Sequence, residues 1–159
     1  MSASPILITG GAQRLGRHCA ERLVQDGQSV IISYRRERLE LEAMRERGIV
    51  TLQADFSSED GILDFLERLK SETGSLRAIV HNASDWAPDS DGDDAGAAFE
   101  RLFRIHMLAP YLINLHAKPL LDACSEPQRD IVHMTDYVVQ KGWRKHAAYA
   151  ATKAGLDNL

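Results

Sequence analysis

The stretch Thr9-Gly10-Gly11-Ala12-Gln13-Arg14-Leu15-Gly16 decides the fold, because it joins a short apolar run to a helical pattern. The run, Pro5 to Thr9, predicts a buried strand, and the pattern from about Leu15 to Asp26 predicts a helix. Glycines at such a turn allow positive φ angles and a close approach to a pyrophosphate, for which the helix N-terminus supplies free N–H groups. The stretch therefore predicts a dinucleotide-binding turn, with a tight connection that holds no ligand as the alternative.

Four further apolar runs follow along the chain, and helical patterns separate them. Each run is rich in Ile, Val or Leu with little alternation, as in strands buried on both faces of a sheet. The runs are Ser29 to Tyr34, Ile49 to Ala54, Arg77 to Asn82 and Asp130 to Met134. Strands that alternate with helices predict parallel pairing with helices on both faces. The expected fold class is therefore α/β, a Rossmann-type doubly wound parallel sheet.

The predicted helices between these strands differ in how they end. Glycine follows each of the first three, at positions 27, 48 and 74, as is common after a helix C-terminus. The second of these spans about 37–47, and Ser57 or Ser58 can cap the third. A fourth helix, about 97–124, contains Pro110 and Pro119 and is expected to kink or break. Before it, residues 85–96 predict an exposed loop.

A last helix is predicted from about Arg144 and is still in an apolar rhythm at Leu159. Neither Gly nor Pro stops it, and no strand follows. The chain therefore looks cut short, with C-terminal strands of the sheet missing.

Composition and charge restrict the classes of function. The chain has 159 residues, 44% hydrophobic and 26% charged, so one globular domain over residues 1–159 is expected. A net charge of -4 argues against nucleic-acid and membrane-surface partners, which would require a basic excess on one face. Cys19 and Cys124 lie in apolar helical patterns and are expected to be core thiols. The first apolar run is too short for a signal peptide or a membrane span, so a cytoplasmic protein is expected.

The end of the second strand indicates which nicotinamide cofactor is used. It reads Ser33-Tyr34-Arg35-Arg36, without the acidic residue that would bind a ribose 2′-hydroxyl. Guanidinium groups suit a 2′-phosphate, to which they donate paired hydrogen bonds. NADP is therefore favoured, and a solvated basic helix start is the alternative.

Tyr149 and Lys153 lie one turn apart on the last helix. For a tyrosine to donate a proton near neutral pH, its pKa must fall from about 10 to about 7, which corresponds to about 4 kcal/mol. A lysine charge at about 4 Å supplies roughly that energy, so Lys153 is expected to lower the pKa of Tyr149. Such a pair is also common on solvent-facing helices, where it has no function.

Asp136 follows the fifth strand, so it belongs at the sheet edge that also carries the glycine turn. Ligands of open α/β sheets bind at this edge. An Asx turn or a helix cap is the alternative for this aspartate.

Together these motifs resemble the short-chain dehydrogenase/reductase family, in its pteridine reductase and dihydromonapterin reductase branch. Arg14 in the glycine turn and Asp136, where most members carry a catalytic serine, are similar to this branch. The resemblance implies that Asp136, Tyr149 and Lys153 are catalytic. It implies NADPH binding by Gly10, Gln13, Arg14, Leu15, Gly16, Tyr34, Arg35, Arg36, Asp55, Phe56, Asn82, Ala83, Tyr149 and Lys153.

The same resemblance assigns a substrate site. Ser84 would hydrogen-bond the substrate and Trp86 would stack on a pterin ring, for which a rim aromatic without a ligand is the alternative. The implied substrate residues are Arg14, Ser84, Trp86, Asp136 and Tyr149. His106 stands where most members carry a catalytic asparagine, which puts the usual water relay to Lys153 in doubt.

The other histidines, at positions 18, 81, 116, 133 and 146, lack metal-ligand spacing and are expected at the surface or at strand ends. No metal is implied.

The expected activity is NADPH-dependent reduction of a dihydropterin, 7,8-dihydromonapterin or dihydrofolate, to the tetrahydropterin. A carbonyl or ketoacyl reductase and a non-catalytic NADP-sensing protein are the alternatives. The resemblance also implies a homotetramer in the full-length form.

Overall fold

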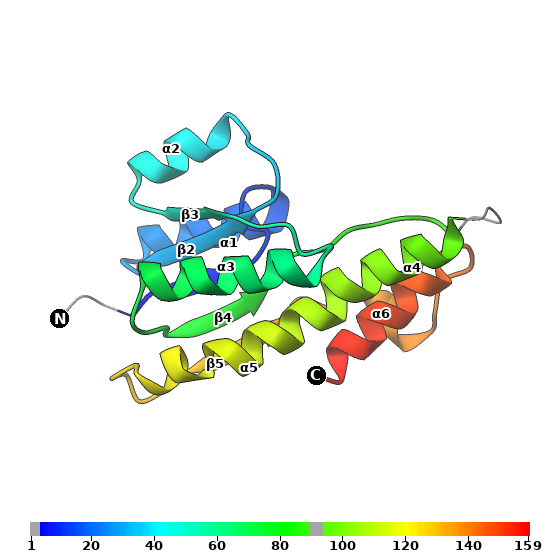
Figure 1. Cartoon of the computed structure of the whole chain (residues 1–159). Coiled ribbons are helices and arrows are strands. Elements are labelled where there is room, and N and C mark those ends of the chain that lie inside the picture. Colours follow the sequence, from blue (N-terminus) through cyan, green and yellow to red (C-terminus); the bar gives the residue numbers. More distant parts are fainter. Residues whose placement is uncertain (1–3, 90–93) are drawn as a thin grey trace.

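The computed structural model describes residues 4–89 and 94–159 and has five parallel strands with helices on both faces (Figure 1). The strand order is β3-β2-β1-β4-β5. The strands, all within the predicted runs, are β1 (Ile6–Ile8), β2 (Val30–Tyr34), β3 (Val50–Gln53), β4 (Ala78–His81) and β5 (Asp130–His133). The order reverses direction between β1 and β4, and the Rossmann-type prediction is confirmed.

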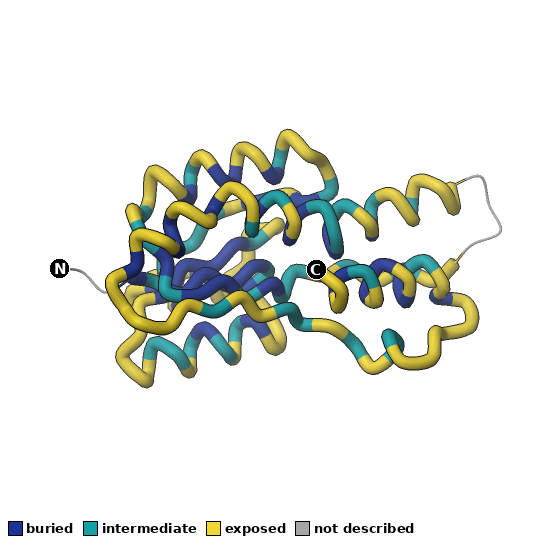
Figure 2. Tube along the Cα trace, turned by 90° about the horizontal axis from the view of Figure 1, so that it is seen from below, coloured by how far each residue is buried: buried dark blue, intermediate teal, exposed yellow. Residues whose placement is uncertain are grey.

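Two apolar layers hold the helices against the sheet. One joins Ile6, Ile8 and Ile32 to α1 (Arg14–Gln25) and α2 (Glu40–Glu46). The other joins Leu7, Ile31 and Ile79 to α3 (Glu59–Glu72) and α5 (Ala109–Asp122). Because alternate strand residues point to opposite faces, one strand serves both layers. β1, β2 and β4 accordingly form the buried centre of the molecule, with exposed outer helix faces around them (Figure 2). The prediction that every strand is buried on both faces is wrong for the edge strands, because β3 is only partly buried and Ile131 and Val132 of β5 are exposed.

The predicted long fourth helix is divided by a π-helical segment. α4 (Ala95–Phe103) leads into π-helix η1 (Arg104–Leu108), and α5 continues from there. Pro110 lies in the first turn of α5, where its missing N–H costs nothing, so the change of helix type comes just before it. Pro119 lies inside α5 near its end, and no break occurs there.

The last helix begins later than predicted, and a short element precedes it. A 3-10 helix, η2 (Tyr137–Gln140), follows β5, and α6 is Ala147–Asp157. Gly142 and Lys145 have φ angles of 65° and 67°, which end helical structure before α6 begins.

Other boundaries differ modestly from the sequence predictions. α2 starts at Glu40, and Ser58 caps α3 by accepting a 3.2 Å hydrogen bond from the Gly61 amide. Of the predicted loop 85–96, residues 90–93 lie outside the described part, and Gly96 belongs to α4. Cys124 is buried and Cys19 is partly buried. Within residues 4–89 and 94–159, no helix is both long enough and apolar enough to cross a membrane.

Candidate active site

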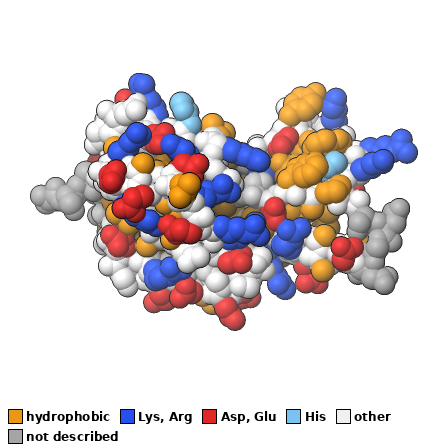
Figure 3. Space-filling model, turned by 90° about the horizontal axis from the view of Figure 1, so that it is seen from above, with side chains coloured by type: hydrophobic (Ala, Val, Ile, Leu, Met, Phe, Trp, Pro, Cys, Tyr) orange, Lys and Arg blue, Asp and Glu red, His pale blue; other side chains and the backbone are white. Residues whose placement is uncertain are grey.

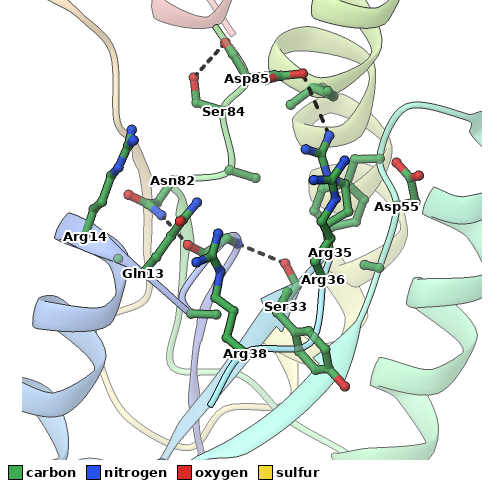
Figure 4. Close-up of a pocket in the computed structure, with 18 of the residues that line it drawn as sticks. Gln13, Arg14, Ser33, Arg35, Arg36, Arg38, Asp55, Asn82, Ser84 and Asp85 are labelled. Carbon is green, nitrogen blue, oxygen red and sulfur yellow. Dashed lines mark hydrogen bonds and ion pairs between the residues drawn. The ribbon is translucent and has the colours of Figure 1, made fainter. Parts of the chain in front are cut away.

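A pocket of about 330 Å³ opens at the carboxyl ends of β1 and β4, where the strand order reverses. This is the position at which open α/β sheets bind ligands. Its lining includes all the residues predicted to bind the cofactor except Tyr149 and Lys153. Basic side chains surround it in Figure 4, and Lys and Arg side chains gather around the hollow on this face of the molecule in Figure 3.

The glycine turn forms one wall of the pocket, and its glycines stand where no side chain would fit. Gly10 has a φ of 64°, and a Cβ there would lie 2.8 Å from the Ala83 Cα. A Cβ on Gly16 would collide with the Asn82 amide and with the Gly10 carbonyl. Arg14 also has a positive φ, 49°, as the first residue of α1. The turn thus brings bare backbone and a helix N-terminus to the pocket, which suits a pyrophosphate.

Asn82 and Thr9 lock this turn to the end of β4. The Asn82 Nδ2 donates to the carbonyls of Thr9 and Gly10 at 2.9 and 3.0 Å. The Thr9 hydroxyl accepts from the backbone amides of Asn82 and Ala83, both at 3.0 Å. Ser33 accepts from the Gly10 amide at 3.0 Å. The sequence analysis missed Thr9 and Ser33, whose only signal is a hydroxyl at the end of an apolar strand.

Arginines form the opposite wall. Arg35, Arg36 and Arg38 line the pocket, and the sequence analysis had omitted Arg38. Arg35 also approaches Asp85, with 3.8 Å between Nη1 and Oδ2, and Arg101 forms an ion pair with the same carboxylate. Asp55, which also lines the pocket, accepts from the Ser57 amide at 2.9 Å. That bond, more than the nearby arginines, holds the pKa of Asp55 below its usual value.

Asp136 and Tyr149 meet beside this pocket. The Tyr149 hydroxyl donates to Asp136 Oδ2 at 2.8 Å, and Asp136 Oδ1 accepts from the Val138 amide at 3.1 Å. Asp136 therefore caps η2, as the alternative predicted, and also contacts Tyr149, because each carboxylate oxygen has a different partner. The bond from Tyr149 is the main cause that lowers the pKa of Asp136, so this carboxyl is ionised at neutral pH.

The pKa of Tyr149 moves in the opposite direction to the one expected from Lys153. Burial, and then the hydrogen bond to Asp136 and its charge, raise this pKa from 10.0 to about 12, and a hydrogen bond with Ser84 opposes them. Lys153 is buried and its Nζ donates to the Met134 carbonyl at 2.9 Å. The expectation that Lys153 lowers the pKa of Tyr149 is thus wrong for this arrangement, because burial and then the Asp136 carboxylate raise that pKa, and Lys153 is not among its causes.

Ser84 connects the tyrosine to the pocket. It lines the pocket, and its side chain lies beside the Tyr149 phenol, where it opposes the rise in the pKa of that phenol. The predicted site therefore comes together at one edge of the sheet. It joins the Gly10 turn, Tyr149 and Asp136.

His106, in place of the family asparagine, is fully buried behind Ser84. Its Nε2 lies 3.0 Å from the Ser84 hydroxyl and 3.2 Å from the Asp85 amide, and its Nδ1 lies 2.8 Å from the Thr152 hydroxyl. Its ring meets the Tyr149 ring edge to face, with centroids 5.5 Å apart. Burial, followed by the Lys153 charge, lowers the pKa of His106 to about 4, so the imidazole is neutral at physiological pH.

Trp86 lies outside the pocket lining, in an aromatic cluster at the start of α6. Its ring centroid is 4.7 Å from that of His146, which stacks on Trp143 at 4.1 Å. Trp86 remains 55% exposed, so part of its ring is free. The prediction that His146 lies at the surface or at a strand end is wrong, because this aromatic cluster buries it.

Asp89, also missed by the sequence analysis, holds the start of α6 in place. Its carboxylate accepts from the amides of Ala147 and Ala148 at 2.6 and 3.2 Å, and its own amide donates to the Lys145 carbonyl at 2.7 Å. Helix N-terminal amides lack partners within the helix, and a carboxylate satisfies them well. The loop after β4 thereby helps to position the helix that carries Tyr149.

Comparison with known proteins agrees with this geometry. A profile described as short chain dehydrogenase matches residues 4–159. The chain belongs to the short-chain dehydrogenase family. This family assignment accounts for the glycine turn, the sheet order and the Tyr149–Lys153 pair together.

Two curated relatives of this short-chain dehydrogenase are named dihydromonapterin reductase. The protein of Klebsiella pneumoniae is 49% identical and that of an Enterobacter species is 46% identical, each over 155 residues. These matches cover 98% of this chain and 65% of each relative. Among solved structures, an alternative dihydrofolate reductase from Brucella canis, FolM, complexed with NADP, is similar with a TM-score of 0.85 and 26% identity. The matched region spans 98% of this chain and 64% of the Brucella chain.

Proposed function

We propose that this short-chain dehydrogenase reduces a dihydropterin to the tetrahydropterin with NADPH, with 7,8-dihydromonapterin or dihydrofolate as the substrate. The observation that carries the proposal is the 2.8 Å hydrogen bond from Tyr149 to Asp136 beside a pocket lined by arginines. An acidic partner for the tyrosine is the pattern of the pteridine reductases that the sequence resembles. The names of the relatives and the NADP in the Brucella structure support the same activity.

The pocket fits an NADP cofactor. The turn from Gly10 to Gly16 offers backbone at a helix N-terminus, and a Cβ added at Gly10, Gly11 or Gly16 would collide with neighbouring atoms, so the turn suits the pyrophosphate. Arg35, Arg36 and Arg38 suit the 2′-phosphate. Tyr149, beside Ser84, and Lys153, one turn further along α6, lie outside the lining and would meet the nicotinamide end.

NADPH, when bound, supplies the hydride that the C=N carbon of the substrate accepts. Tyr149 supplies the proton, because its pKa of about 12 keeps the phenol protonated at neutral pH. The proton passes from the phenol oxygen to the ring nitrogen. Asp136 positions the phenol, and its charge disfavours the phenolate, so solvent reprotonates Tyr149 after each turnover.

Stacking of the substrate on Trp86 is part of the proposal. Trp86 is more than half exposed, and a flat ring entering beside Ser84 would contact its free face. Arg14, the first residue of α1, also lines the pocket and would face both the cofactor phosphates and the pterin.

A steady-state assay tests the activity. NADPH oxidation is followed with dihydromonapterin, dihydrobiopterin, dihydrofolate and a keto compound, for the wild type and for Tyr149→Phe. We expect turnover of at least one dihydropterin, which Tyr149→Phe abolishes while NADPH still binds. Turnover of the keto compound alone, or of none of the four, would reject the proposal.

The choice of NADPH over NADH has its own test. Replacing Arg35 by Ala should weaken NADPH binding about tenfold or more, the effect of losing a charge-assisted hydrogen bond, and should leave NADH binding unchanged. Arg22→Ala is the control, because Arg22 pairs with Asp26 on the outer face of α1. Equal losses for the two cofactors would contradict a 2′-phosphate site at Arg35.

A homotetramer of the full-length protein is also proposed. Tyr111 and Leu115 are more than half exposed and lie one turn apart on α5, as apolar residues at subunit contacts do. Light scattering of the wild type and of Leu115→Lys measures the assembly. A monomeric wild type would contradict it.

A further inference from the structure

The three hydrogen bonds of His106 fix its protonation. The backbone amide of Asp85 can only donate, so Nε2, at 3.2 Å, must be an unprotonated acceptor. In a neutral imidazole the proton then lies on Nδ1, which donates to the Thr152 hydroxyl at 2.8 Å. Thr152 is free to accept, because its own proton goes to the carbonyls of Ala148 and Tyr149, both at 3.0 Å. The opposite tautomer would set two donors against each other at Asp85.

This tautomer in turn determines what Ser84 offers to a ligand. Because Nε2 carries no proton, the Ser84 hydroxyl at 3.0 Å can donate to it, and Nε2 is nearer than the other acceptor of this hydroxyl, the Asp85 carbonyl at 3.4 Å. A hydroxyl has a single proton, so Ser84 can only accept hydrogen bonds from other partners, through its two lone pairs. Asp136, as an ionised carboxylate, also only accepts. The site therefore combines one donor, the Tyr149 phenol, with two acceptors.

We propose that His106 is a positioning residue that holds Ser84 as a hydrogen-bond acceptor and so selects substrates that present an N–H group beside the reacting bond. The substrate part of this inference rests on the proposed pterin reduction. The N–H groups of a pterin's pyrimidine ring match such an acceptor. A ketone matches it poorly, because its oxygen needs donors and would find only Tyr149.

The surroundings of His106 support a fixed neutral ring. It is buried among Ser84, Asp85, Thr152 and the Tyr149 ring, and the nearest charges are Lys153 from α6 and Asp85 from the loop after β4. It lies in the π-helix η1, a helix type often found at functional sites. One side chain thereby joins the loop that carries Ser84 to the helix that carries Tyr149.

NMR of the imidazole nitrogens tests the tautomer without any turnover. The His106 signals are assigned by their loss in His106→Asn. We expect Nδ1 protonated and Nε2 bare, with no titration between about pH 5 and pH 8. A proton on Nε2, or a titration inside that range, would overturn the inference.

Two amide replacements test the consequence for substrate binding. The asparagine amide reaches the place of Nδ1, and the glutamine amide reaches that of Nε2. His106→Asn should therefore release Ser84 and raise the KM for the dihydropterin about tenfold, with the KM for NADPH unchanged. His106→Gln should keep most of the substrate affinity. His116→Asn, on the exposed face of α5, is the matched control.

Two further variants keep the inference testable if His106→Asn fails to fold. Thr152→Val removes the acceptor for Nδ1 at nearly constant volume and should also raise the KM for the substrate. Ser84→Ala should abolish any further effect of His106→Gln or Thr152→Val on that KM. Active variants with wild-type KM values would overturn the role of His106. A wild type that turns over no dihydropterin would instead overturn the proposed function and leave the NMR result standing.

Discussion

Asp136 joins Tyr149 to the 3-10 helix η2, with one carboxylate oxygen 2.8 Å from the phenol and the other 3.1 Å from the Val138 amide. Each bond restrains the side chain, so the carboxylate has little freedom to turn away from the tyrosine. Its position depends on backbone that lies next to it in the chain. The site thus contains a tyrosine whose pKa is raised by burial and then by this contact, and an aspartate whose pKa is lowered mainly by the same contact.

Replacing Asp136 by Asn should move the alkaline limit of activity to lower pH. The active form of Tyr149 is protonated, so activity is lost as the pH rises through its pKa. The carboxylate is one cause that raises this pKa to about 12, and its removal lowers the pKa. We expect kcat to fall about 100-fold as well, because the phenol is no longer positioned.

The pH dependence of kcat/KM measures this shift. Asp122→Asn, which changes an exposed carboxylate paired with Lys118, should keep the wild-type profile. An unchanged alkaline limit in Asp136→Asn would contradict the coupling between the two residues.

Replacing Gly16 by Ala should abolish cofactor binding. The new Cβ would meet the Asn82 amide and the Gly10 carbonyl, so the turn must open to accept it. Fluorescence titration with NADPH measures the dissociation constant, which we expect to rise at least about 100-fold, the effect of an overpacked backbone contact. Gly74→Ala is the control, because a Cβ there meets nothing within 4 Å. Tight NADPH binding by Gly16→Ala would rule out this turn as the pyrophosphate site.

Replacing Asp89 by Ala should destabilise the protein and impair catalysis together. The amides of Ala147 and Ala148 lose their acceptor, which costs about 1 kcal/mol for a helix cap. Since these amides lie in the first turn of the helix that carries Tyr149, kcat should fall more than the KM for NADPH. Urea unfolding and steady-state kinetics give the two values. Asp89→Asn retains one oxygen and should be intermediate; a variant with wild-type stability would show that the cap is dispensable.

The stability of the protein should fall between about pH 6.5 and pH 4. Burial lowers the pKa of His81 to about 4, so the folded state stays neutral where the unfolded state, at 6.5, binds a proton. Unfolding therefore takes up protons in this window, and acid favours the unfolded state by about 3 kcal/mol for this histidine. His81→Gln should flatten the slope of the unfolding free energy against pH. His116→Gln, at an exposed position, should leave the slope unchanged.

The sheet and the nucleotide turn could be predicted because their signals are local. Each strand lies in a short segment rich in Ile, Val or Leu, and the glycines of the first turn are needed because a side chain there would collide with neighbouring atoms. The 3-10 helix after Asp136 and the delayed start of α6 could not be predicted in this way. They depend on positive φ angles at Gly142 and Lys145 and on the distant Asp89 carboxylate, which no periodicity in the last helix reveals.

The site residues divide in the same way. Asp136, Tyr149 and Ser84 were predicted from motifs, and they do converge. The predicted pKa direction of Tyr149 was wrong because spacing along a helix identified Lys153 as its partner, whereas the fold buries the phenol and places it in contact with Asp136. The role of Asp89 also required three-dimensional information, since the residue is only one of several aspartates in its loop.

The π-helix η1 makes the spacing between α4 and α5 sensitive to chain length. A π turn accommodates one more residue than an α turn, so shortening Arg104–Leu108 by one residue would allow an uninterrupted α-helix. α4, on the N-terminal side of the deletion, would then be rotated by about 100° relative to α5. Leu102 would leave the interior, and the loop beyond α4 would have to approach the tyrosine helix from another direction. Single-residue deletions in this segment should therefore be much less tolerated than substitutions at its partly buried positions, Arg104, Met107 and Leu108.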